Sequence, residues 1–396
     1  MRICHVITRL IVGGAQENTL LTCRELHARG HHVTLLAGPQ TGPEGSMHLD
    51  AETGGHDVRI VDSLRREVNP WRDWIALARL RDILGQLNPD IVHTHSSKAG
   101  ILARLAARDV GVPVIVHTIH GMSFNRTQSL PARWLYTCLE RYCADFTHRF
   151  ICVADAMTEQ AVAAGVAPAD RFVTIRSGIE ITRFDAELYD GRTVRARLGL
   201  PIDAVVVATI ARLAPNKGYE QLIAAVQLAA AIDPRLRFLW IGDGPSRPHY
   251  QRRLEELGLG DCVDFVGLVR PEQIPELLAA SDMLAHASLW EGLPRAAVQA
   301  LLMGRPVACF DTDGSREVVA DHQTGRLVPM GDVNLLAKAI CDLAADARQR
   351  TAMGRAGRQL CLQQFDYRAM VDGIENVYFE VGGDRLRPPS IGRGDR

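Results

Sequence analysis

One segment in the second half of the chain combines a carboxylate with flexible backbone at the start of an expected helix. Glu291 is followed by Gly292, Leu293 and Pro294, and proline suits a first helical position because its missing N–H would be unpaired there. The amides of Gly292 and Leu293 and the positive end of the helix could bind a diphosphate. A neighbouring carboxylate suits a neutral, hydroxyl-rich group on that diphosphate, as in a nucleotide-activated sugar. The alternative is a capped helix with an incidental glutamate.

A second segment carries two cations five residues apart. Arg212 and Lys217 follow an expected strand, and Lys217 is one of three lysines among 45 basic residues, with Lys98 and Lys338. An arginine fork and the point charge of a lysine can neutralise the two phosphates of one diphosphate from different sides. The alternative is a solvated basic loop.

The first half offers glycines and histidines at strand ends. Gly13 and Gly14 precede an expected helix, where main-chain amides can approach an anion, although a tight turn has the same sequence. His120 could accept a hydrogen bond from a sugar hydroxyl or place its main-chain carbonyl at the reacting centre. His93 and His95 share one face of a strand, as a pair of zinc ligands would. No carboxylate or cysteine completes that set at a recognisable spacing, so we expect no metal.

Two further segments have both a structural and a functional interpretation. Residues 311–318 form either a polar rim of a cleft or an ordinary helix start capped by Ser315. The arginine-rich stretch 65–81, with Trp71 and Trp74, is either a solvated helix or a surface that rests on an anionic membrane.

Short apolar runs alternate with amphipathic stretches along the chain, which predicts parallel sheets covered by helices. Expected strands are residues 2–8, 33–37, 58–61, 90–93, 114–118, 150–154 and 172–175, then 205–211, 237–241, 263–266, 283–287, 306–310 and 325–328. Expected helices are residues 15–29, 71–87, 99–108 and 133–146, then 219–232, 247–257, 272–280, 294–303 and 334–346.

A chain of 396 residues, 47% of them hydrophobic, is long enough for two domains. We expect a Rossmann-like domain over residues 1–180, a linker over 181–200, and a second Rossmann-like domain over 201–365. A helix over 366–381 would cross back to the first domain, and 382–396 would be a disordered tail. Ligands of such sheets bind at the carboxyl ends of the strands, so the site should lie in a central cleft.

Several classes of protein are disfavoured. A net charge of −1 produces no overall positive field that would attract nucleic acid. No strand is followed by a Gly-x-Gly-x-x-Gly fingerprint, a Walker loop or a Gly-x-Ser-x-Gly elbow. We expect a cytoplasmic protein that could contact the inner face of the membrane. Its nine cysteines are scattered, it has no signal-peptide pattern, and it has no apolar run of 18 residues.

Five motifs in order resemble the family-4, or group 1, glycosyltransferases of the GT-B fold. They are Arg212–Lys217, Gly242–Pro245, Val263–Gly267, Glu291–Pro294 and Thr324–Pro329. The resemblance covers residues 2–365, and His93–Gly100 is similar to members that build bacterial surface polysaccharides. It implies a two-domain enzyme that transfers a sugar with retention of configuration and needs neither a metal nor another cofactor.

The resemblance also implies roles for single residues. His120 would lie at the donor sugar and reacting centre, Arg212 and Lys217 would stabilise the leaving diphosphate, and Glu291 would bind hydroxyls of the donor sugar. The remaining donor-binding residues would contact the diphosphate or the nucleoside: Gly14, Gly242, Arg270 (at the base), Gly292, Leu293 and Gln299.

Gln299 is a departure, because the family has a second glutamate eight positions after the first, where it reaches the ribose hydroxyls. A glutamine keeps an acceptor oxygen but loses the charge-assisted hydrogen bond, which is about twice as strong as a neutral one. We therefore expect weaker nucleotide binding or an altered donor preference.

The donor is expected to be a nucleoside diphosphate sugar, with uridine favoured, and the acceptor a hydroxyl group, for example on a lipid-linked sugar. Loops at residues 42–52 and 124–130 would select the acceptor. Two alternatives stay open at this point: a catalytically silent subunit that binds a sugar nucleotide, and a sugar-nucleotide epimerase of the same fold.

Overall fold

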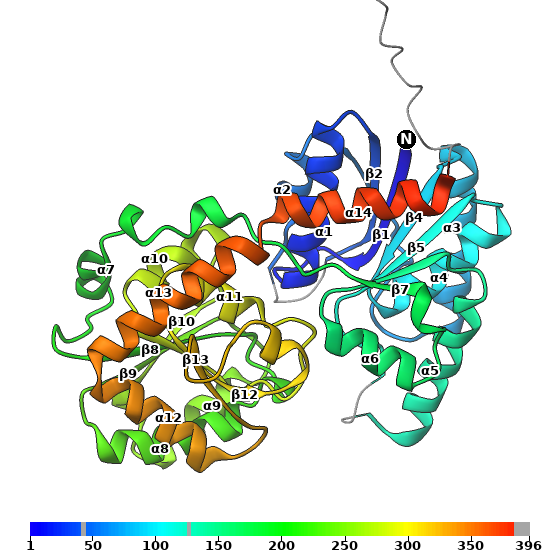
Figure 1. The fold of residues 1–396 in the computed structure, drawn as a ribbon. Coiled ribbons are helices and arrows are strands. Elements are labelled where there is room, and N and C mark those ends of the chain that lie inside the picture. The colour runs from blue at the N-terminus through cyan, green and yellow to red at the C-terminus, as the bar shows by residue number, and fades with distance from the viewer. Residues whose placement is uncertain (41–44, 125–127, 384–396) are drawn as a thin grey trace, which may run out of the picture.

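The computed structural model describes residues 1–40, 45–124 and 128–383, which form two parallel sheets covered by helices (Figure 1). The strand order is β3-β2-β1-β4-β5-β6-β7 in the first sheet and β10-β9-β8-β11-β12-β13 in the second. The first sheet contains β1 (Arg2–Arg9), β2 (His32–Gly38), β3 (Asp57–Ile60), β4 (Ile91–His95), β5 (Val114–Ile119), β6 (Arg149–Cys152) and β7 (Phe172–Thr174). The second contains β8 (Val205–Ile210), β9 (Leu236–Ile241), β10 (Val263–Gly267), β11 (Met283–His286), β12 (Val307–Asp311) and β13 (Gly325–Pro329). The predicted α/β fold with two Rossmann-like sheets is confirmed.

The helices connect successive strands. The α-helices are α1 (Gly14–Ala28), α2 (His48–Glu52), α3 (Pro70–Leu87), α4 (Ser97–Asp109), α5 (Leu130–Ala144), α6 (Asp155–Ala163), α7 (Gly191–Arg197), α8 (Tyr219–Ile232), α9 (Arg247–Glu256), α10 (Ile274–Ala279), α11 (Arg295–Leu302), α12 (Val333–Ala345), α13 (Ala347–Gln364) and α14 (Tyr367–Gly382). The short 3-10 helices are η1 (Ala169–Arg171), η2 (Ile181–Arg183), η3 (Ala186–Leu188), η4 (Pro215–Lys217), η5 (Gly260–Cys262), η6 (Pro271–Gln273) and η7 (Asp313–Glu317).

Several element boundaries differ from the sequence prediction. The helix expected at 272–280 is divided into η6 and α10, each with a proline in its first turn. The long helix α13 was not predicted, because it buries small residues such as Gly354 and Gly357 where an apolar stripe was sought. A side chain on Gly354 would overlap the carbonyl oxygen of Gly304, so the helix packs closely at this point. The predicted acceptor loops lie partly outside the described residues, as does nearly all of the expected disordered tail.

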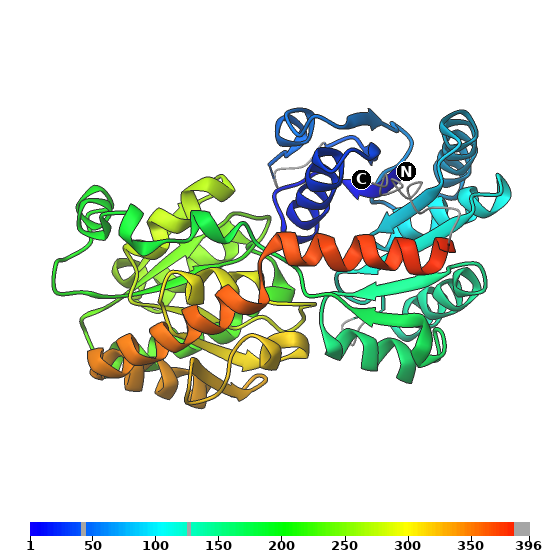
Figure 2. The same ribbon diagram turned by 45° about the horizontal axis from the view of Figure 1, so that its top comes forward.

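Helix α14 leaves the second sheet and lies across the first (Figures 1 and 2). Its buried side chains Met370, Ile374 and Tyr378 pack in one hydrophobic cluster with Ile3 and Ile7 of β1. The C-terminal helix thereby covers the face of β1, β4 and β5 that points away from α3 and α4. In the described part of the chain, no helix combines the length and hydropathy that crossing a bilayer requires.

Each sheet has a point where the strand order reverses, between β1 and β4 in the first and between β8 and β11 in the second. The loops that follow these strands diverge to opposite faces of the sheet and leave a crevice between them. The segments that begin at Gly13, Ser96, Arg212 and Ala287 therefore start at the two crevices.

Candidate active site

The two crevices open into one cleft with a cavity volume of about 460 Å³. Both halves of the chain line this cleft, and nine of the ten predicted site residues are among the lining residues. Those nine are Gly14, His120, Arg212, Lys217, Gly242, Glu291, Gly292, Leu293 and Gln299. Arg270 is not among them, because its side chain is exposed on the turn before η6 while its neighbours Val269 and Pro271 line the cleft.

Glu291 and Lys217 form an ion pair in the cleft. Oε1 of Glu291 lies 2.6 Å from Nζ of Lys217 and accepts a second hydrogen bond, at 3.2 Å, from Nε2 of His286. Burial alone would raise the pKa of Glu291, but the charge of Lys217 and the bond from His286 outweigh it and lower the pKa well below its usual range. Glu291 is therefore a carboxylate at every pH at which the protein would be assayed. His286 was not predicted as a site residue, although it ends β11 at the crevice.

The main chain around Glu291 is fixed by Asp313, in the segment that the sequence suggested as a polar rim. Oδ2 of Asp313 accepts a hydrogen bond from the Glu291 amide at 2.8 Å, and Oδ1 accepts one from Gln160 of the first half. Asp313 itself adopts a left-handed backbone conformation, with φ 44°. The alternative of a helix capped by Ser315 is wrong, because the segment is the 3-10 helix η7 and Thr312 precedes it.

Gly292 and Leu293 present main-chain amides to the cleft. In the described part of the chain, no acceptor pairs with either N–H. Helix α11 begins one residue later than expected, at Arg295, and Pro294 is the residue that precedes it. Two donors and the positive end of α11 thus face the cavity beside Glu291, which is a favourable environment for an anion.

His120 joins the two halves at this point. Its carbonyl oxygen packs so closely on Gly292 that a Cβ atom there would lie 1.9 Å away. The His120 ring is half-buried, and burial, with Arg295 nearby, lowers its pKa to about 3. The ring is therefore neutral near pH 7 and can accept as well as donate a hydrogen bond.

Arg295 is a cross-cleft cation that the sequence analysis did not identify. From the start of α11 its guanidinium reaches Glu17 of α1 at 2.9 Å and donates to Ser177 Oγ and the Gly178 carbonyl, both at 2.7 Å. Its stem lies against Gly14, where a Cβ atom would be 2.5 Å from Cδ of Arg295. Gly14 therefore makes room for this contact between the two halves. No sequence signal separates Arg295 from the other arginines, because its partners are distant in the chain.

Gly242 and Gln299, the remaining predicted residues, also line the cleft. Gly242 follows β9, and its amide donates to the carbonyl of Gly267. Gln299 lies on α11 and is 8% exposed, so it faces the cavity from an otherwise buried helix. Val269 and Pro271 line the same cleft and supply apolar surface.

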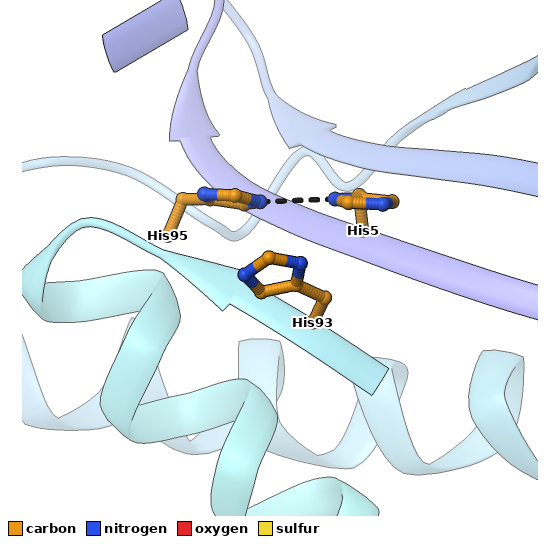
Figure 3. A group of neighbouring side chains, drawn as sticks. All are labelled: His5, His93 and His95. Atoms are coloured by element: carbon orange, nitrogen blue, oxygen red, sulfur yellow. Dashed lines mark hydrogen bonds between the residues drawn. The ribbon is translucent and has the colours of Figure 1, made fainter. Parts of the chain in front are cut away.

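The histidine pair that the sequence raised as a zinc site acquires a third member. His5 of β1 lies beside His93 and His95 of β4, and ring nitrogens of the three lie within 4.8 Å of one another (Figure 3). Every ring nitrogen in this trio already has a hydrogen-bond partner: His5 and His95 pair with each other, and the others pair with Tyr378, Thr118 and His120. The trio is therefore a connected hydrogen-bond network.

Comparison with known proteins agrees with this geometry. The family described as "Glycosyl transferases group 1" matches residues 190–360, and the "Glycosyl transferase 4-like domain" matches residues 13–178. An Escherichia coli UDP-Gal:alpha-D-GlcNAc-diphosphoundecaprenol alpha-1,3-galactosyltransferase is 27% identical over 96% of this chain and 97% of its own length. A GDP-mannose-dependent alpha-(1-6)-phosphatidylinositol monomannoside mannosyltransferase of Mycolicibacterium smegmatis is 27% identical over 90% of this chain and 92% of its own.

Among solved structures, Anabaena HepE in complex with UDP-glucose superimposes with a TM-score of 0.82 at 21% identity, over 96% of this chain and all of that one. The GT-B arrangement of two facing Rossmann-like sheets is thus shared. The two family matches, the relatives and the fold lead to one conclusion: the chain belongs to the group 1 (family-4) glycosyltransferases, which are retaining enzymes that use nucleotide sugars.

Proposed function

We propose that the protein transfers a sugar from a uridine diphosphate sugar to a hydroxyl acceptor in the assembly of a bacterial polysaccharide or glycolipid. The observation that carries the proposal is the Lys217–Glu291 pair beside the amides of Gly292 and Leu293. A cation and main-chain amides suit the diphosphate, and a permanent carboxylate suits the sugar hydroxyls. The E. coli relative named for a UDP-galactose donor, and HepE, which was solved with UDP-glucose, support uridine.

The residues divide the work along the donor. Arg212 and Lys217 neutralise the phosphates, and lysine has three donors, so Lys217 can hold Glu291 and a phosphate oxygen together. Oε1 of Glu291 is occupied by Lys217 and His286, so Oε2 is the oxygen for a sugar hydroxyl. Gln299 and Gly242 lie at the nucleoside, and the neutral ring of His120 accepts a hydrogen bond from the donor sugar.

In the reaction, the bond between the anomeric carbon and the diphosphate breaks while Arg212, Lys217 and the α11 amides take up the developing charge. The acceptor hydroxyl then attacks from the face that the diphosphate leaves, and its proton passes to a phosphate oxygen. Configuration is retained without a covalent sugar–enzyme intermediate. Cations of the chain supply the stabilisation that a metal would otherwise give, so activity should survive EDTA.

The proposal is tested by incubating the protein with labelled UDP-, GDP- and ADP-sugars, with and without a lipid-linked sugar acceptor. A transferase releases nucleoside diphosphate rapidly only when acceptor is present. Conversion of the sugar without acceptor would indicate an epimerase, and stabilisation by the nucleotide without any turnover would indicate a binding subunit. Either result would overturn the proposal.

We also propose peripheral contact with an anionic cytoplasmic membrane face through α3. Trp71 and Trp74 are 71% and 59% exposed and stack with ring centroids 5.5 Å apart, and Arg72 is exposed between them. Aromatic rings and arginines of this kind suit the interface of an anionic bilayer. Sedimentation with phosphatidylglycerol vesicles should fall in a Trp71→Ala/Trp74→Ala variant and be unchanged in Trp134→Ala, an exposed tryptophan on α5. Equal sedimentation of all three proteins would argue against contact through α3.

A further inference from the structure

A continuous chain of hydrogen bonds runs from the cleft to the C-terminal helix. Nε2 of His120 lies 3.0 Å from Nδ1 of His95, and Nε2 of His95 lies 2.9 Å from Nδ1 of His5 (Figure 3 shows the latter contact). Nε2 of His5 lies 3.5 Å from the hydroxyl of Tyr378, which is 2.6 Å from Nδ1 of His93. The chain ends where Nε2 of His93 meets the Thr118 hydroxyl at 2.6 Å.

The members of this chain cannot choose their protonation states independently. Burial lowers the pKa of His5, His93, His95 and His120 far enough that all four rings are neutral near pH 7. A neutral imidazole has one donor nitrogen and one acceptor nitrogen. Each contact needs one donor, so the direction of one bond fixes the direction of the next, and the whole chain has only two consistent arrangements.

Tyr378 selects between these arrangements. Burial raises the pKa of its hydroxyl, so the group keeps its proton, and a phenol O–H donating to an imidazole nitrogen is a stronger bond than an imidazole N–H donating to a phenol oxygen. The short contact to His93 suits that strong bond, and the longer contact to His5 suits the weaker one. Tyr378 therefore donates to His93 and accepts from Nε2–H of His5.

We propose that Tyr378 is a positioning residue which, through His5 and His95, holds His120 in the tautomer protonated on Nε2. In that arrangement His5 accepts from His95, and His95 accepts from His120. Nδ1 of His120 then has no proton and remains for a ligand as a hydrogen-bond acceptor. This inference rests on the proposed function, in which His120 accepts a hydrogen bond from the donor sugar.

A transition-metal site in the same cluster is the competing use of three histidines. The ring nitrogens of His5 and His95 are at hydrogen-bond distance, and a metal between them would have to break that bond together with those to Tyr378 or Thr118. The saturated network therefore favours the positioning role, and elemental analysis of the protein separates the two uses.

The first test reads the tautomer itself. In protein labelled with ¹⁵N-histidine, the two-bond nitrogen–proton couplings of His120, assigned with a His120→Ala variant, should show the proton on Nε2. Tyr378→Phe should move a measurable fraction of it to Nδ1. Tyr367→Phe removes from the same helix a hydroxyl that has no hydrogen-bond partner in the described part of the chain, and this variant should change nothing. A proton on Nδ1 in the unaltered protein, or no change in Tyr378→Phe, would overturn the proposal, as would one tightly bound zinc per chain.

The second test is kinetic. Tyr378→Phe should lower kcat/KM for the donor by about fivefold to tenfold, the equivalent of one neutral hydrogen bond. The dissociation constant of UDP should stay unchanged, because the residues proposed to bind the nucleoside belong to the second half of the chain. The effect should vanish in a His120→Ala background. An equal loss in that background would show that Tyr378 acts elsewhere. Full activity of His120→Ala alone would overturn the proposed hydrogen bond between the His120 ring and the donor sugar. The tautomer measured by NMR would be unaffected by that result, so the two proposals fail separately.

Discussion

Lys217 Nζ and Glu291 Oε1 lie 2.6 Å apart across the point where the strand order of the second sheet reverses. Lys217 follows β8 and Glu291 follows β11, which are neighbouring strands whose connections leave in opposite directions. The crevice that results admits a ligand, and the pair stands in it with a carboxylate that stays ionised. The proposed donor site thus follows from the sheet topology as well as from the residue types.

Gly292 and Gly14 should respond differently to alanine. A Cβ atom on Gly292 would meet the main-chain oxygen of His120, which cannot move without shifting the first half, whereas one on Gly14 would meet the flexible stem of Arg295. We expect Gly292→Ala to lower kcat/KM at least about a hundredfold, since small misplacements of reacting groups have effects of that size. Gly14→Ala should lower it far less. Steady-state kinetics of both variants measures the two losses in kcat/KM. A larger loss in Gly14→Ala than in Gly292→Ala would contradict the close contact between Gly292 and the His120 carbonyl.

The contact between Arg295 and Glu17 should stabilise the assembled cleft. Arg295 has a side chain only 10% exposed, and Glu17→Gln would leave its charge without a carboxylate partner. Breaking such a buried pair costs about 3 kcal/mol, less where solvent reaches it. The melting temperature of Glu17→Gln should therefore fall, and Glu52→Gln, an exposed residue of α2, should leave it unchanged. Equal melting temperatures for all three proteins would show that the pair contributes nothing.

Gln299→Glu tests the departure from the family pattern. The side chain lines the cleft from α11, and a carboxylate there would form a charge-assisted hydrogen bond with a ribose hydroxyl, about twice as strong as the amide bond. The donor Michaelis constant should fall while kcat changes little. Gln227→Glu, at an exposed glutamine of α8 outside this cleft, is the control for added charge. An unchanged Michaelis constant in Gln299→Glu would place the ribose elsewhere.

Acidification should destabilise the protein through its buried histidines. Burial lowers the pKa of His5, His93, His95, His117 and His120, in the case of His5 to about 3. Between pH 6.5 and 3 the unfolded chain binds protons that the folded protein does not, so stability falls as pH falls. For His5 alone the loss from pH 7 to pH 5 is about 2 kcal/mol. The melting temperature should decline steadily below pH 6.5, and it should decline more gently in His5→Gln. A melting temperature that stays constant down to pH 5 would contradict the burial of these histidines in the neutral form.

The local sequence was sufficient to predict the two sheets and the strand ends that Arg212, Lys217 and Glu291 follow. It did not identify His286 or Arg295, and it gave Asp313 only as part of a possible polar rim, because the roles of these residues depend on partners elsewhere in the chain. His5 and His95 are 90 residues apart and meet only because β1 and β4 are neighbours in the sheet. Arg270, which the family pattern assigns to the base, lies on an exposed turn whose neighbouring residues line the cleft, and its contact with the base stays a prediction.

The central claim, that Lys217 holds the diphosphate and Glu291 the sugar, is tested most directly by calorimetric titration with UDP and with the UDP-sugar that the protein turns over. Glu291→Gln should bind UDP at least as tightly as the unaltered protein, because Lys217 is no longer neutralised, and should lose the turnover and the added affinity that the sugar provides. Lys217→Ala should weaken both ligands, with a loss in kcat of about 10²–10³. Normal turnover of the donor by Glu291→Gln, or an equal loss of its affinity for UDP and for the UDP-sugar, would contradict these roles of Lys217 and Glu291.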